Sequence, residues 1–341
     1  MFFSRGSGLF FTLLCQIGWS AKSLAFSDIV VDGVTYPSTK SAGAAIKDYS
    51  QVVIKEGRHV GELKIDANDV NVMGVDGAIV SIDEKSARGF FVISGQRVSI
   101  KNVACEGKLA NNRSACVWSN GNDLELYNMT FLYQGLAIVD IAKQGTLTID
   151  SCVFEGGGLG RKKTVVDAAS PHLVIYNSQF KGAAKGAQLI RAKSYQTEIY
   201  NSYLYADNQT GRLVDFPYGG KVKIEGNLIF QSSYAKVFHG IAYGSSVFGR
   251  KRVHHFSVKN NLILLERKKG SAFLGEYPKN KSIPIEINNN VFIGKLKDKE
   301  KVELTNLVLA DRKVAELSIN KVPDFTKVAQ YLDYIRFLHS E

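Results

Sequence analysis

The segments Leu173-Val-Ile-Tyr-Asn-Ser (173–178) and Thr197-Glu-Ile-Tyr-Asn-Ser (197–202) are near copies of one another and decide the fold. In each segment apolar and polar residues alternate, and an Asn stands two positions after a central Ile. Alternation with a period of two is typical of a strand with one buried face, whereas an amphipathic helix repeats every 3.6 residues. Both copies are also rich in the β-branched and aromatic residues that strands favour, so they predict strands.

The same unit recurs along most of the chain. Its central apolar residue stands at Ile100, Leu126, Ile149, Ile175, Ile199, Ile224, Val258, Ile287 and Leu304. The first six are separated by 26, 23, 26, 24 and 25 residues, and the less regular later spacings indicate inserted loops. A unit of about 25 residues that buries its apolar face only by stacking on its neighbours predicts a solenoid. The fold class is therefore all-β, a right-handed parallel β-helix with three strands per turn.

A column of Asn residues marks one bend of every turn. Two residues after each central position stand Asn102, Asn128, Ser151, Asn177, Asn201, Gly226, Asn260, Asn289 and Asn306. Asn and Gly tolerate the left-handed backbone that a tight bend between two strands requires. Stacked amide side chains also hydrogen-bond to one another, so we predict an Asn ladder at this bend.

Both ends of the chain differ from the repeat. Arg5, the apolar run from Leu9 to Leu14 and the small residues up to Ala25 predict a signal peptide over residues 1–25, cleaved after Ala25. We therefore expect a secreted or periplasmic protein. The β-helix is assigned to residues 26–310 and a C-terminal capping segment with a helix to residues 311–341. Because open solenoid ends invite aggregation, we expect residues 42–49 to cap the first turn and the helix after Pro323 to form a lid on the last.

The charge of the chain suggests its partner. The formal net charge is +11, and loss of Arg5 and Lys22 with the signal peptide leaves +9. An exported basic protein meets anionic polymers, so we expect an anionic polysaccharide as partner. We expect no nucleic acid as partner, because the basic clusters match no nucleic-acid-binding module. We also expect no membrane span, because no later apolar run reaches the roughly 20 residues that one requires. The protein is expected to be a monomer. The alternative is that the excess Lys only keeps an extended protein soluble.

Three cysteines remain after the signal peptide, at Cys105, Cys116 and Cys152. An odd number cannot form a complete set of disulfides. The sequence leaves two alternatives open, a bridge between Cys105 and Cys116 or three buried free thiols.

A second column, on a different strand of each turn, carries charged residues. The strands are Ile138-Val-Asp, Val165-Val-Asp, Leu189-Ile-Arg and Leu213-Val-Asp. With Val139, Val166, Ile190 and Val214 inside, alternation predicts that Asp140, Asp167, Arg191 and Asp215 point outward in one column. Lys193 stands two positions after Arg191, exposed and available to a bound acidic sugar.

This column allows three interpretations. Lys or Arg could remove the proton beside a uronate carboxylate in a lyase or epimerase, and two carboxylates separated by roughly 6.5 to 9.5 Å could serve a glycoside hydrolase. The third alternative is a ladder of ion pairs that only stabilises the surface, each pair worth ~0.2 to 1 kcal/mol. We favour a lyase or epimerase acting on an acidic polysaccharide, with a non-catalytic binding or surface-structural protein as the alternative and a hydrolase third.

The Asn column and the opening Ala44-Ala45-Ile46 followed by Val53-Ile54-Lys55-Glu56-Gly57 resemble the pectate-lyase-like superfamily of right-handed parallel β-helices, including exported bacterial members. Lys193-Ser194 is similar to a Lys-Ser pair of the alginate lyase and chondroitinase B family, where an Arg-His-Gly follows on the next turn. This chain has Asp215-Phe216-Pro217-Tyr218-Gly219 there instead. The resemblance implies a polysaccharide lyase in which Lys acts as base and Arg as acid, often with calcium at the sugar carboxylate.

These arguments give one set of candidate residues. We predict Arg191, Lys193 and Asp215 as catalytic. The residues expected to bind substrate are Asp140, Asp167, Arg212, Tyr218, His239 and Tyr243, the aromatic ones by stacking on sugar rings. Calcium remains open as a cofactor, and no residue is assigned to a metal site.

Overall fold

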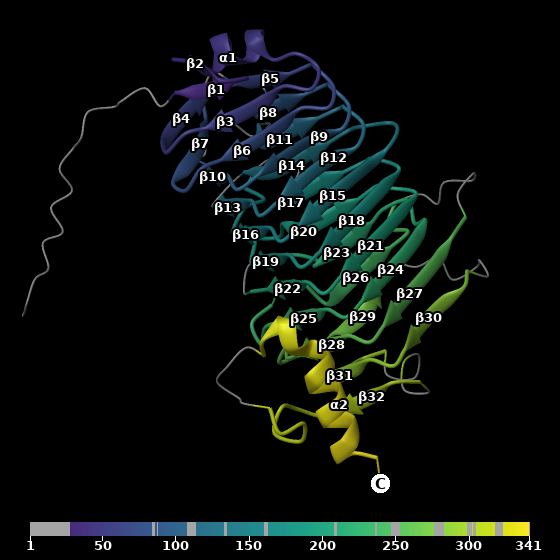
Figure 1. Cartoon of the computed structure of the whole chain (residues 1–341). Coiled ribbons are helices and arrows are strands. Elements are labelled where there is room, and N and C mark those ends of the chain that lie inside the picture. Colours follow the sequence, from purple (N-terminus) through teal and green to yellow (C-terminus); the bar gives the residue numbers. More distant parts are fainter. Residues whose placement is uncertain are drawn as a thin grey trace, which may run out of the picture.

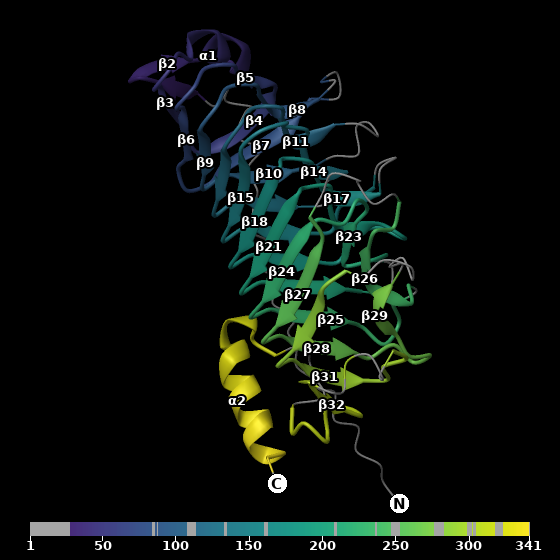
Figure 2. The ribbon, with the colours of Figure 1, turned by 90° about the vertical axis from the view of Figure 1, so that its right-hand side faces the viewer.

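The chain folds into a parallel β-solenoid of about eight turns, as predicted (Figure 1). The computed structural model describes residues 28–83, 86, 88–107, 114–132, 135–159, 163–207, 210–235, 237–246, 253–275, 283–298, 302, 305–317 and 323–340. The predicted signal peptide and its cleavage site lie outside these residues. The first turn stands at one end of the stack and the C-terminal helix at the other (Figures 1 and 2).

Three long sheets form the walls, here called sheets A, B and C. Within the described residues, sheet A holds twelve strands in the order β2-β1-β3-β6-β9-β12-β15-β18-β21-β24-β27-β30. Their bounds are β1 (Ile29–Val31), β2 (Val34–Tyr36), β3 (Gln51–Ile54), β6 (Asn71–Gly74), β9 (Val98–Lys101), β12 (Leu124–Tyr127), β15 (Thr146–Asp150), β18 (His172–Tyr176), β21 (Gln196–Tyr200), β24 (Lys221–Glu225), β27 (His255–Lys259) and β30 (Ile285–Asn288). Strand β1 pairs antiparallel with β2 and β3, and the others follow in parallel.

Sheets B and C complete each turn. Sheet B runs β4 (Gly57–Gly61), β7 (Ala78–Ile82), β10 (Ala104–Glu106), β13 (Thr130–Leu132), β16 (Val153–Glu155), β19 (Gln179–Lys181), β22 (Tyr203–Ala206), β25 (Leu228–Gln231), β28 (Leu262–Leu265), β31 (Val291–Gly294) and β32 (Leu307–Leu309). Sheet C runs β5 (Leu63–Ile65), β8 (Gly89–Ile93), β11 (Ala115–Ser119), β14 (Leu136–Asp140), β17 (Thr164–Ala168), β20 (Gln188–Ala192), β23 (Val214–Phe216), β26 (His239–Tyr243) and β29 (Ala272–Gly275).

The two α-helices of the described chain lie at opposite ends (Figure 1). Helix α1 (Thr39–Ala45) begins after Ser38, whose hydroxyl accepts the Ser41 N–H, and it buries Ala42 against the first turn. A cap was predicted over residues 42–49, and the helix starts three residues earlier and ends at Ala45. Helix α2 (Val328–Leu338) follows a 3₁₀ turn (Phe325–Lys327). No helix among the described residues has the length and apolar character that a membrane span requires.

The predicted C-terminal helix is present, but it covers the flank of the last turns rather than their end. Its buried side chains, Val328, Leu332 and Ile335, belong to an apolar cluster with the outward residues of sheet B. That outer face carries Tyr203, Leu228, Phe230, Leu262, Leu264, Val291 and Ile293. In Figure 2 the helix lies alongside β28 and β31. An outer sheet face this apolar needs a cover, and α2 supplies it.

The bend after sheet A has the left-handed backbone that the sequence predicted. Positive φ angles between 44° and 71° occur at Asn102, Asn128, Ser151, Asn177, Asn201, Gly226, Asn260 and Asn289. These side chains are exposed or half-buried. The bend column therefore meets a backbone requirement rather than a packing one.

At the predicted bend one amide pair forms, with Asn128 Nδ2 donating to Asn102 Oδ1 at 2.8 Å, but the continuous ladder lies one residue further along than predicted. Asn227 donates its backbone N–H to the Asn261 side-chain oxygen, Asn261 to Asn290, and Asn290 to Asn306, each at 2.9 Å. Ser178 and Ser202 continue the ladder toward the N-terminus. Asn227, Asn261 and Asn290 are at most 1% exposed. Asn306, which we had assigned to the bend, thus belongs to this buried ladder.

Substitution at the bend tests the first of these columns. We expect Asn177→Val and Asn201→Val each to lower the free energy of unfolding by about 1–3 kcal/mol, because a β-branched residue is strained at φ of 52° and 44°. Urea unfolding followed by circular dichroism measures the change. The glycine variants at both positions are the controls and should unfold close to the unaltered protein. Equal stability of the valine and glycine variants would contradict the assigned bend.

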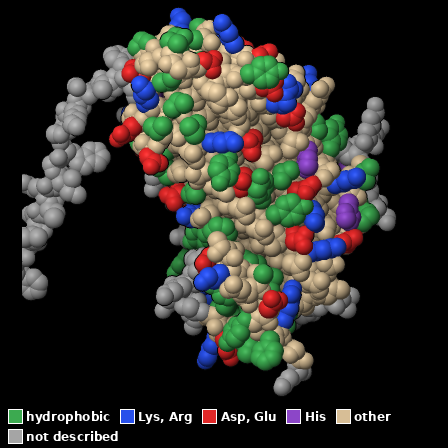
Figure 3. Space-filling view, viewed as in Figure 1, with side chains coloured by type: hydrophobic (Ala, Val, Ile, Leu, Met, Phe, Trp, Pro, Cys, Tyr) green, Lys and Arg blue, Asp and Glu red, His purple; other side chains and the backbone are tan. Residues whose placement is uncertain are grey.

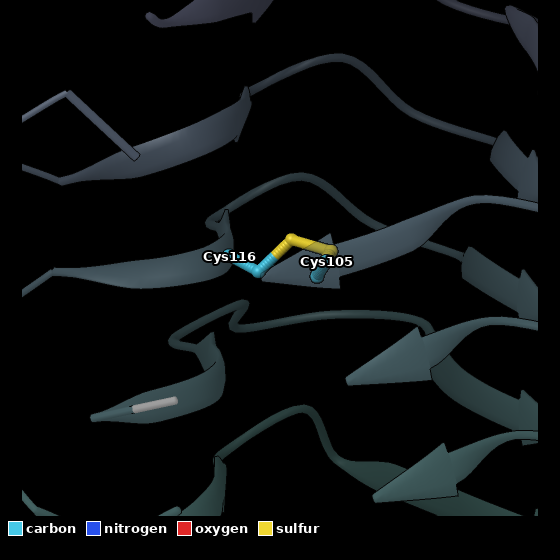
Figure 4. Close-up of a disulfide and its surroundings, with 2 residues drawn as sticks. All are labelled: Cys105 and Cys116. Atoms are coloured by element: carbon cyan, nitrogen blue, oxygen red, sulfur yellow. A yellow bond between two sulfur atoms is a disulfide. The ribbon is translucent and has the colours of Figure 1, made fainter. Parts of the chain in front are cut away.

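The sequence left a bridge between Cys105 and Cys116 open, and the structure contains it (Figure 4). It joins β10 of sheet B to β11 of sheet C across the core, with the two Cα atoms 6.2 Å apart. Cys152 is a free buried thiol, and burial raises its pKa to about 12. The bridged pair and the buried thiol explain the odd cysteine count.

The disulfide closes a short loop, since 11 residues separate its cysteines in sequence. By the chain-entropy argument, replacing both by Ala should lower the free energy of unfolding by about 3 kcal/mol. Thermal unfolding with and without reductant measures this. Reductant should destabilise the unaltered protein and leave the double variant unchanged; equal sensitivity of the two proteins would contradict the prediction.

Candidate functional site

The outer face of sheet C carries the predicted charged column. Asp167, Arg191 and Asp215 are register partners on β17, β20 and β23. Their neighbours on the inner side, Val166, Ile190 and Val214, are fully buried in the core. The alternation therefore places these three charged residues outward, as the sequence predicted. Strand neighbours of this kind lie about 4.8 Å apart.

Asp140 does not belong to this column, contrary to our prediction. Ile138 pairs with Val166, so Val139 and not Asp140 is the register partner of Asp167. The Asp140 carboxylate is 1% exposed and accepts the N–H groups of Ala142, Ala169 and Ser170. Burial raises its pKa, although these hydrogen bonds act in the opposite direction. Asp140 thus holds a turn together, and the prediction that it points outward in the charged column is wrong.

Lys193 contacts Asp167 directly. Its Nζ lies 2.5 Å from Asp167 Oδ1, and its backbone N–H donates to the Ala168 carbonyl. The side chain is 23% exposed, whereas Asp167 is 1% exposed. The expectation of an exposed Lys193 without a fixed partner was therefore wrong. Lys193 directly follows β20, the strand next to β17 in sheet C, and this position holds its ammonium group over the Asp167 carboxylate.

Asp215 is the centre of the second half of the cluster. Its carboxylate accepts hydrogen bonds from Gln188 Nε2 at 3.2 Å and Ser245 Oγ at 2.6 Å. Arg191 Nε lies 3.7 Å away and an Arg212 Nη atom 3.9 Å away. The Asp215 side chain is 4% exposed, and the two arginines are 32% and 22% exposed.

The cluster formed by Asp167, Arg191, Lys193, Arg212 and Asp215 is here called the sheet C cluster. Its two carboxylates lie beneath its three cationic side chains, so solvent meets mainly positive charge. Carboxylates held in this way are poorly placed to act as the acid and base of a hydrolase, because each is shielded and bound by cations. The arrangement instead suits the recognition of an anion.

Three contributors to this face were missed in the sequence. Gln188 and Ser245 hydrogen-bond to Asp215, yet Ser245 is 30 residues away in sequence and no local pattern marks it. Trp118 shares the outward column through its register with Val139. The Arg88 guanidinium lies 4.4 Å from the Trp118 ring centre. The alternation in β11 is the signal that could have identified Trp118.

The three aromatic candidates differ in their placement. Tyr218 is half-buried in the turn after β23. The His239 ring is half-buried and packs so closely on Gly275 that a Cβ there would collide with it. Tyr243 is fully buried, packs on Phe216 and Phe256, and donates its hydroxyl to the Gly220 carbonyl at 2.6 Å. The expectation that Tyr243 lies on the outer surface, where it could stack on a sugar ring, is therefore wrong; its aromatic ring fills the core.

A second polar surface covers the outside of sheet A. Glu198 accepts hydrogen bonds from Tyr200, Gln196 and His172. Burial pushes the pKa of Glu198 up, but these three hydrogen bonds outweigh it and hold that pKa below its ordinary value. On the same face Lys223 pairs with Glu225 and Lys259 with Glu286. Basic and acidic side chains are interspersed in Figure 3, as expected of a surface stabilised by ion pairs.

Comparison of the chain with protein-family models, curated proteins and solved structures found no match. Over the described part of the chain, no group of three or more His, Cys, Asp and Glu side chains is placed to hold a metal ion.

Proposed function

We propose that the protein binds an acidic polysaccharide along the outer face of sheet C. The observation that carries the proposal is that Arg191, Lys193 and Arg212 cover two buried carboxylates. Three cations against two carboxylates leave one positive charge in excess, and the cations are the exposed partners. Guanidinium and ammonium groups are the usual protein partners of carboxylate and sulfate groups.

The neighbouring strands supply an apolar surface beside this charge. Trp118 and Val139 precede Asp167, Arg191 and Asp215 in the same outward column. Four strand spacings of about 4.8 Å make this row ~19 Å long. An aromatic ring for stacking next to cations for the acidic group is the combination that a chain of charged sugars requires. A small neutral molecule would not use the row of charges.

β-Elimination is the reaction that we propose for this face. Cations beside a uronate carboxylate would neutralise it and make the adjacent C–H more acidic. Lys193, whose Nζ is held 2.5 Å from Asp167 Oδ1, would accept the C–H proton after it has released its own proton to solvent. The electron pair would form the new carbon–carbon double bond, the departing glycosidic oxygen would take a proton from solvent, and Arg191 would stabilise the developing negative charge as a cation. The resemblance of Lys193-Ser194 to the alginate lyase family supports the same assignment of Lys193.

A double variant tests the proposal without changing the net charge. Asp167→Asn with Lys193→Gln removes one cation and one carboxylate from the sheet C cluster. We expect binding of an oligouronate, measured by calorimetry, to weaken at least tenfold, about 1.4 kcal/mol. Any release of unsaturated sugar, followed by ultraviolet absorbance, should stop.

The matched control removes an ion pair from sheet A. Lys223→Gln with Glu225→Gln also preserves net charge, and these side chains lie 3.0 Å apart on the other face. The control should bind and react as the unaltered protein does. Weaker binding by the control together with unchanged binding by the Asp167 and Lys193 variant would contradict the site. Retained binding without any unsaturated product would assign recognition without lyase chemistry.

A further inference from the structure

A second basic groove lies at the corner where sheet B turns toward sheet C, near the C-terminal end. It encloses about 500 Å³ and is lined by the last residue of β31 and by the residues that directly follow β28, β31 and β32. Those residues are 266–268, Gly294 with Lys295, and 310–313. The three strands are neighbours in the sheet, so their following turns stack into one wall. We call this feature the corner groove.

The corner groove has a clear excess of positive charge. Five of its lining residues are cationic, against two carboxylates, Glu266 and Asp311; the cationic residues are Arg267, Lys268, Lys295, Arg312 and Lys313. Both carboxylates are already engaged. Glu266 forms an ion pair with Arg312, and Asp311 accepts the backbone N–H groups of Lys313 and Val314. Lys268, Lys295 and Lys313 are exposed at its surface.

Two arginines give the groove a fixed floor. The Arg312 side chain is 8% exposed and lies between Glu266 and the Phe230 ring, whose centre is 5.1 Å from the guanidinium. Arg267 donates to the carbonyls of Ala235 and Gly270 at 2.9 and 2.7 Å. Groups held in this way lose little freedom on binding, which favours affinity.

Aromatic side chains stand beside the cations. Tyr234 is 62% exposed, and Lys268 Nζ lies 4.7 Å from its ring centre. Phe238 is 37% exposed, with the Arg267 guanidinium 5.8 Å from its ring. A simple inorganic anion has no use for these rings, whereas a sugar ring stacks on them.

We propose that the corner groove is a separate binding site for an acidic oligosaccharide, whose carboxylate or sulfate groups contact Lys268, Lys295 and Lys313. Its volume falls within the roughly 300–1,000 Å³ of ligand sites that take a compact ligand. The site shares no residue with the sheet C cluster, so it stands whether or not that cluster binds a polysaccharide.

The test uses the full chain carrying the Asp167→Asn and Lys193→Gln changes, so that binding at sheet C is weakened. Into this background go Lys268→Gln, Lys295→Gln and Lys313→Gln, all at exposed positions. The matched control carries Lys40→Gln, Lys47→Gln and Lys143→Gln, also exposed and of equal charge change. The probes are a galacturonate tetrasaccharide and a chondroitin sulfate tetrasaccharide, titrated by calorimetry at low salt.

We expect the corner variant to bind at least one probe tenfold or more weakly than the background, and the control variant to remain within about twofold of it. The probe that loses more affinity identifies carboxylate or sulfate as the preferred group. Corner and control variants of equal affinity would overturn the proposal, as would failure of both probes to bind the background protein. Because both variants are made in the same background, a failure of the sheet C proposal leaves this comparison intact.

Discussion

Replacing Asn261 by Leu is expected to lower the free energy of unfolding by about 3–5 kcal/mol, because several buried groups lose their partners at once. The Asn261 amide donates to the carbonyls of Ile224 and Lys259 and to the Asn290 side chain. Its oxygen accepts the Asn227 N–H. Leu has a similar volume and fills the space, so the loss reports hydrogen bonds rather than a cavity.

Urea unfolding of the full chain, followed by far-ultraviolet circular dichroism, measures this change. The control is Asn201→Gly, which removes an exposed bend side chain while keeping its φ of 44° accessible. It should shift the free energy of unfolding by less than about 1 kcal/mol. If Asn261→Leu unfolds at the same midpoint as this control, with an unchanged slope, the buried ladder does not hold the turns together.

Phe154→Ala should also destabilise the protein strongly, by about 3–5 kcal/mol. The Phe154 ring lies between the rings of Phe131 and Phe180, and the three ring planes are nearly parallel. The centre of the Phe154 ring is 4.6 Å from that of Phe131 and 4.3 Å from that of Phe180. All three are at most 1% exposed and come from consecutive turns. Removing the middle ring therefore leaves a cavity, which closes only if the neighbouring strands β13 and β19 move inward.

The comparison for this prediction is Phe337→Ala on α2, where the side chain is 76% exposed. That change should alter the free energy of unfolding by no more than about 0.5 kcal/mol. Thermal and urea unfolding of both variants give the difference directly. A Phe154→Ala protein as stable as Phe337→Ala would show that the stacked rings contribute little to the core.

The repeat in the sequence was sufficient to predict the strands, the bend and the inward columns. We predicted the ladder one residue too early in the repeat. In earlier turns Met129 and Cys152 occupy the position of Asn227, Asn261 and Asn290, so the sequence of those turns shows no column of amide side chains at this position. The bend column, in contrast, is marked by Asn in most turns. The positive φ at the bend is required in every turn, so the residues that tolerate it recur throughout the sequence. The buried ladder needs polar side chains only in the turns that take part in it.

The candidate site was predicted less completely. Register confirms the column of Asp167, Arg191 and Asp215, but Ile138 rather than Val139 pairs with Val166, so Asp140 lies one position beyond the column. Ser245 reaches Asp215 from a later turn, and Tyr243 packs inward beside Phe256. The carboxylates are covered by Arg191, Lys193 and Arg212, which come from more than one turn, so alternation within one strand could not show their burial.

Hydrogen–deuterium exchange with a bound oligogalacturonate tests the central claim, that an acidic polysaccharide is recognised on the outer face of sheet C, most directly. The measurement uses the protein with Lys268, Lys295 and Lys313 changed to Gln, so that the corner groove does not contribute. The account predicts slower exchange in β17, β20 and β23 and in the segment that contains Arg212, with β18 and β21 of sheet A unchanged. Protection confined to sheet A, or none at a concentration that saturates binding, would contradict it.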